Sequence, residues 1–148
     1  MDSRIKMYFD IRELVCPHVY ERDGEGAWIY FDPRLLETLL AIRELINRPI
    51  FVNNWDMGGN LSQRGLRCNV CQLVKTKTAL EKVYMTAHGQ GMGVDFNVQG
   101  MTTDEVHLWL TSNAKHLPYP FRVELNTDTW IHIDVRSDGK QKLTWFKG

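Results

Sequence analysis

The chain has 148 residues, enough for one domain with a hydrophobic core. Its 18 Lys and Arg residues balance 18 Asp and Glu residues, so no overall basic field is available to attract nucleic acid or an anionic membrane. The first residues mix charged with apolar side chains and lack the apolar core of a signal peptide. We therefore expect residues 1–148 to form a single monomeric domain that is made in the cytoplasm, with no nucleic-acid or membrane partner.

The clearest element of the first half is a helix that begins after Asp32. Asp32 is a good N-cap acceptor, and Pro33 suits the first helical position. Apolar residues then recur at helical spacing, namely Leu35, Leu36, Leu39, Ile42 and Ile46. The segment 47–49 ends this helix, and residues 50–52 predict a short buried strand.

Two loops without clear periodicity follow. Residues 53–71 are rich in Asn, Gly and Arg and predict a long loop, a kind of segment that is often functional in compact domains. A glycine-rich loop over residues 86–93 precedes a predicted strand at 94–98.

The last third predicts one helix and three strands. Thr102 and Glu105 have the spacing of a capping box at a helix start. Residues 122–125 and 130–135 predict two strands joined by a turn, and residues 143–146 a final strand. Because helices and strands alternate without a βαβ rhythm, we expect an α+β fold with a central antiparallel sheet packed by helices.

The cysteine content is odd, at three, which argues against a disulfide framework. Cys68 and Cys71 form a C-x-x-C pair that can be half of a zinc site, and Cys16 and His18 can supply the other two ligands. This would make the chain a small zinc-ribbon protein. The spacing alone favours the alternative, that these are reduced thiols in a loop or in the core.

Another candidate metal site combines two histidines and an aspartate. His88 lies in the glycine-rich turn, Asp95 lies on the strand that follows, and His132 lies on a later strand. Imidazole nitrogens and carboxylate oxygens are good zinc ligands, and three of them leave a fourth position for water. By strand alternation, Trp130 and Asp134 share the face of His132.

The segments around these three residues resemble the zinc D-Ala-D-Ala carboxypeptidases, which share a fold with the Hedgehog signalling domain. His88, Gly91 and Asp95 fit the family pattern S-x-H-x-x-G-x-A-x-D, with Thr86 in place of serine and Gly93 in place of alanine. The segment 130–134, Trp-Ile-His-Ile-Asp, is similar to the W-x-H motif that carries the third ligand. The resemblance implies a Hedgehog/DD-peptidase-like fold and a Zn²⁺ ion held by His88, Asp95 and His132.

The proton carrier is less clear, because the position three residues before His132, often acidic in the family, is Thr129. Our first candidate is Glu124 on the preceding strand. If the two strands pair across a three-residue turn, Glu124 faces Trp130 and shares a face with His132. Asp128 is the second candidate. Asp134 is a partner of a ligand or a surface acid.

The loop arginines Arg64 and Arg67 lie where the family places an arginine that grips a substrate carboxylate, a task that suits the planar guanidinium group. The alternative is solvated loop charge. The resemblance implies a zinc metallopeptidase, a carboxypeptidase or endopeptidase of peptidoglycan stem peptides, such as a phage lysin that reaches the cell wall after release. The alternative is a non-catalytic zinc-containing module that binds cell wall or belongs to a phage structure.

Overall fold

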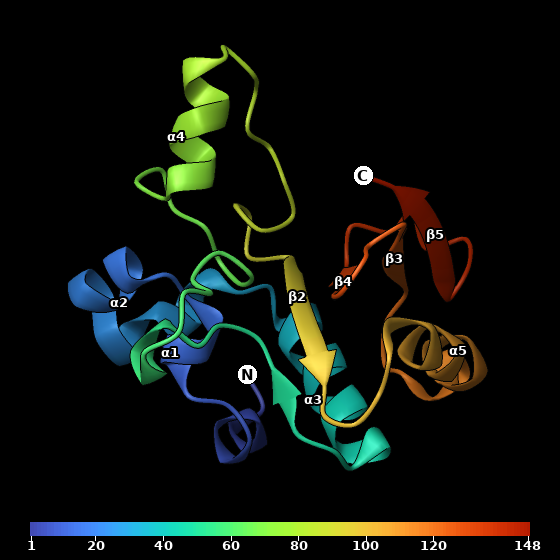
Figure 1. Cartoon of the computed structure of the whole chain (residues 1–148). Coiled ribbons are helices and arrows are strands. Elements are labelled where there is room, and N and C mark those ends of the chain that lie inside the picture. Colours follow the sequence, from blue (N-terminus) through green and yellow to red (C-terminus); the bar gives the residue numbers. More distant parts are fainter.

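Five strands form one sheet in the computed structural model, which describes all 148 residues. The strands are arranged in the order β1-β2-β4-β3-β5. Their bounds are Ile50–Phe51 for β1, Gly93–Val98 for β2, Phe121–Leu125 for β3, Ile131–Asp134 for β4 and Leu143–Lys147 for β5. The α+β class predicted from the sequence is confirmed (Figure 1).

The sheet is mixed, not purely antiparallel as predicted. The pairs β1–β2, β2–β4 and β4–β3 are antiparallel, whereas β5 pairs with β3 in parallel. Both edges of β4 are already occupied by β2 and β3. The final strand, β5, therefore pairs with the free edge of β3. It runs antiparallel to β4, and because β3 is also antiparallel to β4, β5 is parallel to β3.

Five α-helices and four short 3₁₀ segments complete the fold. The α-helices are α1 (Ile11–Leu14), α2 (Pro17–Asp23), α3 (Pro33–Ile46), α4 (Gln72–Ala79) and α5 (Thr103–Asn113). The 3₁₀ segments are Ser3–Met7, Gly24–Tyr30, Trp55–Met57 and Ala114–His116. None of the helices combines the length and the apolar character needed to cross a bilayer.

The two predicted helices begin at the predicted caps. The Asp32 side chain accepts a hydrogen bond from the Arg34 backbone N–H, and α3 ends at Asn47 in a left-handed conformation. Thr102 and Glu105 form a complete capping box at the start of α5.

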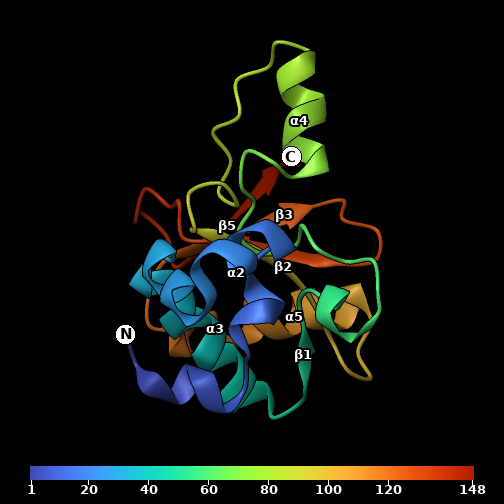
Figure 2. The same cartoon turned by 90° about the vertical axis from the view of Figure 1, so that its left-hand side faces the viewer.

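Alternation along the three central strands separates an apolar face from a polar face. Val94, Phe96 and Val98 on β2 are buried in one core with Ile131 and Ile133 on β4, Phe121 and Val123 on β3, and apolar residues of α3 and α5. Helices α3 and α5 lie on one side of the sheet and α4 on the other (Figure 2). The residues between the core positions point to the opposite face, and these are Asp95, Asn97, Arg122, Glu124, His132 and Asp134.

Helix α4 stands apart from the rest of the molecule in both views (Figures 1 and 2). It buries only Val74. Hydrophobic packing therefore does little to hold this helix in place.

Candidate metal centre

The three predicted ligands meet at the polar face of the sheet. The register of β2 and β4 sets Asp95 directly opposite His132. His88 arrives from the preceding loop, where the Ala87 carbonyl oxygen accepts hydrogen bonds from the backbone N–H groups of Met92 and Gly93 and closes a tight turn. Chain segments far apart in the sequence thus bring three ligand side chains to one point, and all three are buried.

The separations between the ligand atoms fit one small cation. Asp95 Oδ1 lies 3.2 Å from His88 Nε2 and 2.8 Å from His132 Nδ1, and the two nitrogens are 3.2 Å apart. Ligand atoms held tetrahedrally at zinc bond lengths lie about 3.3 Å apart. A slight outward movement of the side chains would therefore admit a zinc ion, and the structure contains a group of residues that can hold a metal ion here.

The outward nitrogens of both histidines are already hydrogen-bonded. His88 Nδ1 donates to the Gly65 carbonyl oxygen at 2.9 Å, and His132 Nε2 donates to Asp134 Oδ2 at 3.0 Å. These bonds fix each ring with its second nitrogen facing Asp95, where that nitrogen could donate a lone pair to a metal that replaced the proton on His132. Asp134 is in turn held by two hydrogen bonds from the Arg122 guanidinium, at 2.8 and 2.9 Å.

The electrostatics of the centre favour a positive charge at its middle. Burial lowers the pKa of His132, but the carboxylates of Asp134 and Asp95 outweigh it and raise that pKa to about 9. Burial likewise raises the pKa of Asp95, and hydrogen bonds from His132 and His88 more than reverse it, leaving the pKa well below its usual range. The space between the three side chains can therefore contain either a proton carried by His132 or a metal cation bound by all three residues.

Two adjoining cavities open on either side of Asp95. One, of about 420 Å³, is lined by the arginine loop together with Asp95, Asn97 and Thr129. The other, of about 400 Å³, contains all three ligands and Glu124. Arg67, Asp95 and Trp130 line both cavities, so together they form one cleft along the ligands.

Glu124 lies on the same cavity wall as the ligands, but the strand register differs from the predicted one. Arg122 pairs with Asp134 and Val123 with Ile133, so the ladder continued by one residue sets Glu124 opposite His132, not opposite Trp130. The connection between the strands is longer than the predicted three-residue turn. A shift of two residues preserves the face of each side chain, so Glu124 remains on the side of His132.

The other carboxylates differ in position. Asp128 is exposed and lines neither part of the cleft. Asp134 is buried between His132 and Arg122, so it is a partner of a ligand and not a surface acid. The Glu124 carboxylate lines the cleft with Gly148 directly against it, since a Cβ atom added at Gly148 would lie 1.7 Å from Glu124 Oε1.

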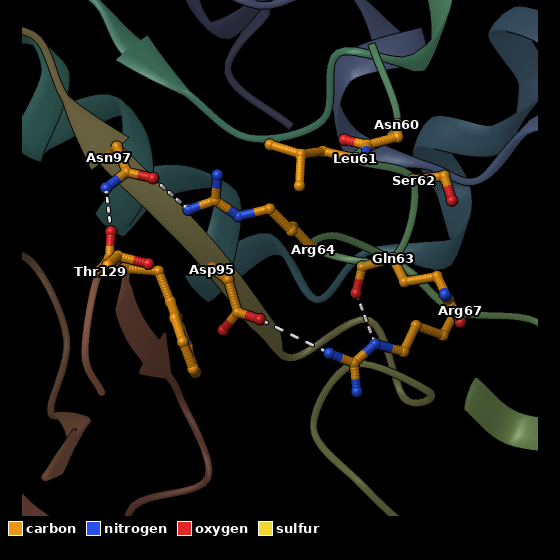
Figure 3. Close-up of a pocket in the computed structure, with 10 residues that line it drawn as sticks. Asn60, Leu61, Ser62, Gln63, Arg64, Arg67, Asp95, Asn97 and Thr129 are labelled. Atoms are coloured by element: carbon orange, nitrogen blue, oxygen red, sulfur yellow. Dashed lines mark hydrogen bonds and ion pairs between the residues drawn. The ribbon is translucent and has the colours of Figure 1, made fainter. Parts of the chain in front are cut away.

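The two arginines enter the cleft differently (Figure 3). Arg67 is held by the Gln63 carbonyl oxygen at 2.5 Å and lies 3.5 Å from Asp95 Oδ2. Arg64 donates one hydrogen bond to Asn97 Oδ1 at 2.6 Å, and its other guanidinium N–H groups have no partner within the chain. Burial lowers the pKa of Arg64, and the nearby Asp95 opposes this shift.

Asn53 and Trp55 lie behind the arginine loop and do not line the cleft. Asn53 accepts a hydrogen bond from the Arg64 backbone N–H, and the indole of Trp55 donates to the Val15 carbonyl oxygen. They support the loop. Sequence reasoning gave no role to Arg122, although its place two residues before Glu124 on β3 was a usable signal.

A second group of metal-ligating side chains lies in another part of the molecule. Cys16, His18, Cys68 and Cys71 place one ligand atom each within 4.8 Å of one another, and this group too can hold a metal ion. The sequence favoured reduced thiols in a loop or in the core. The three cysteines are free and Cys16 and Cys71 are in the core, and the structure gathers all three with His18.

Comparison of the chain with family models, curated proteins and solved structures finds no match.

Proposed function

We propose that this chain is a zinc metallopeptidase with a Hedgehog/DD-peptidase-like fold, acting on peptide bonds in peptidoglycan stem peptides as a carboxypeptidase or related endopeptidase. The observation that carries the proposal is the convergence of His88, Asp95 and His132 at the floor of a cleft, with both outward histidine nitrogens already bonded. A catalytic zinc site is of this kind, with three protein ligands that leave one side open to water and substrate.

When bound, zinc would supply Lewis-acid chemistry, polarising the scissile carbonyl and lowering the pKa of water. Glu124 provides the proton transfer. Its carboxylate takes the proton of the attacking water and passes it to the amine nitrogen of the leaving group. Its place on the cavity wall that contains all three ligands, opposite His132 in the strand ladder, supports this role.

Arg64 is the better candidate for binding a substrate carboxylate. Arg67 is engaged by a backbone carbonyl and lies beside Asp95, so its main task is to position the loop and to balance the charge of that ligand. Arg64 keeps unpaired N–H groups on the part of the cleft beyond Asp95. A peptide whose terminal carboxylate reaches Arg64 would pass across the metal ligands, as a carboxypeptidase requires.

The test is hydrolysis of defined stem peptides and intact peptidoglycan by the zinc-loaded protein. Release of D-Ala or of new amino groups is expected from the wild type, with a loss of at least about a hundredfold in Glu124→Gln, the scale of general acid–base catalysis. Glu21→Gln is the matched control, because Glu21 is exposed and lines neither part of the cleft. Equal activity of Glu124→Gln and wild type would exclude Glu124 as the proton carrier.

The alternative, a non-catalytic zinc-containing module, is favoured by Thr129. This position lacks a carboxylate, and its backbone oxygen is occupied by a hydrogen bond from Asn97. Such a module would sediment with insoluble peptidoglycan and release no product from any stem peptide.

A further inference from the structure

Four sulfur and nitrogen donors meet where the N-terminal helices contact the arginine loop. Cys16 precedes α2, His18 lies in its first turn, and Cys71 precedes α4. Cys68 follows directly after Arg67. Cys16 and Cys71 are buried, Cys68 is half-buried, and His18 lies at the exposed rim.

Four of the six separations between these donors match the edges of a zinc tetrahedron. Cys68 Sγ lies 3.6 Å from Cys16 Sγ, 3.8 Å from Cys71 Sγ and 3.6 Å from His18 Nδ1, and Cys71 Sγ lies 3.9 Å from that nitrogen. Zinc bonds of about 2.3 Å to sulfur and about 2.0–2.1 Å to nitrogen, at tetrahedral angles, give edges of about 3.8 Å between sulfurs and about 3.6 Å between sulfur and nitrogen.

A disulfide does not explain this arrangement. Bonded sulfurs lie about 2.05 Å apart, and all three cysteines are free. A disulfide between any two would leave the third thiol and the histidine beside it without a role. Packing of apolar thiols does not explain it either, because an exposed imidazole takes part in the cluster.

The surrounding backbone is consistent with thiolate ligands. The Val70 backbone N–H donates to Cys68 Sγ at 3.4 Å. Just before the cluster, Val15 and Leu66 form a parallel β-bridge, with the Leu66 backbone N–H donating to the Leu14 carbonyl oxygen at 2.8 Å. Cys16 and Cys68 thus follow two chain segments that are already fixed side by side.

We propose that Cys16, His18, Cys68 and Cys71 form a closed structural zinc site, separate from the centre of His88, Asp95 and His132. Four protein ligands leave no position for substrate, so the site serves structure and not catalysis. It fixes the base of α4, which buries little apolar surface. It also fixes residues 64–68, of which Arg64 and Arg67 line the cleft. The inference does not depend on peptidase activity.

The experiment uses the full chain purified with zinc, with metal content measured by mass spectrometry. Two equivalents are expected in the wild type. Cys68→Ser and Cys71→Ser should each keep one equivalent, and so should His88→Ala, which removes a ligand of the other centre. X-ray absorption of the zinc in His88→Ala should find sulfur neighbours at about 2.3 Å.

A second measurement needs no variant. In the zinc-loaded wild type all three thiols should resist a thiol reagent, and a chelator should release them together. Free reaction of the thiols at zinc saturation, or only nitrogen and oxygen neighbours in the absorption spectrum of His88→Ala, would overturn the proposal. Detection of a disulfide in the unreduced protein would also overturn it. Absence of stem-peptide hydrolysis would leave these readouts unchanged, so the two proposals fail separately.

Discussion

Asp134 is a buried carboxylate that orients a candidate metal ligand, His132. It accepts from His132 Nε2 and is itself held by the Arg122 guanidinium and by the Arg136 backbone N–H. These contacts fix the ring of His132 so that Nδ1 faces Asp95. The rigidity of the centre therefore depends on Asp134, which contacts a candidate ligand but is not one of the three.

Asp134→Asn should weaken zinc binding at this centre by about 10- to 100-fold, because the amide keeps the shape but loses the charge that orients and polarises His132. Competition with a chelator measures the dissociation constant. Asp138→Asn is the matched control, since Asp138 is exposed and pairs only with Lys140. An unchanged dissociation constant in Asp134→Asn would contradict the role given to this carboxylate.

Arg64→Lys should raise the KM for peptides with a free terminal carboxylate by about tenfold or more, with a smaller change in kcat, because lysine cannot make the bidentate contact. The same peptides with an amidated terminus provide the control. They should bind the wild type poorly and show little difference between wild type and variant. If KM rises equally for both kinds of peptide in the variant, Arg64 does not bind the terminal carboxylate.

At the level of elements, β2 places its ligand by close packing against the loop before it. A Cβ atom at Gly93 would lie 2.7 Å from the Ala87 Cβ and 3.2 Å from His132 Cε1. Glycine therefore suits this position, because Ala87 already fills the space that a side chain would need.

Gly93→Ala should therefore lower the free energy of unfolding by about 1–3 kcal/mol through overpacking. Adding Ala87→Gly should restore part of the loss. Gly26→Ala is the control, because its new Cβ would meet nothing within 4 Å, and it should change stability by less than about 0.5 kcal/mol. Denaturant unfolding measures all four proteins. Equal stability of Gly93→Ala and wild type would mean that the turn relaxes freely.

The elements predicted from the sequence are those with a strong local signal. Helix α3 has a cap, a proline and a long apolar repeat, and α5 has its capping box. Helices α1, α2 and α4 have at most eight residues and no such repeat, so local patterns did not reveal them. The pairing of β5 with β3 depends on which sheet edge is free, and this is a property of the assembled sheet.

The candidate centre was easier to predict than the cysteine cluster for a similar reason. His88 and Asp95 are close in sequence and share a recognisable turn, and strand parity alone placed Glu124 on the correct face. Cys16 and Cys68 are 52 positions apart, so only the folded chain brings them together.

For the molecule as a whole, α4 should depend on metal more than any other element. Chelation should increase the rate of tryptic cleavage at Lys75, Lys77 and Lys82, on α4 and the segment after it, by about tenfold or more as local opening becomes easier. Cleavage at Lys140 and Lys142, in a loop away from the cysteines, is the internal control. Equal protection of α4 with and without metal would show that other contacts hold it.

The parallel strand β5 has a practical consequence. It carries Phe146 and leads to Gly148, both of which line the cleft beside Glu124. Any peptide fused to Gly148, such as an affinity tag, would begin in the cleft and occupy space beside Glu124. Met1 does not line this cleft, so recombinant protein for activity and metal measurements should carry its tag there.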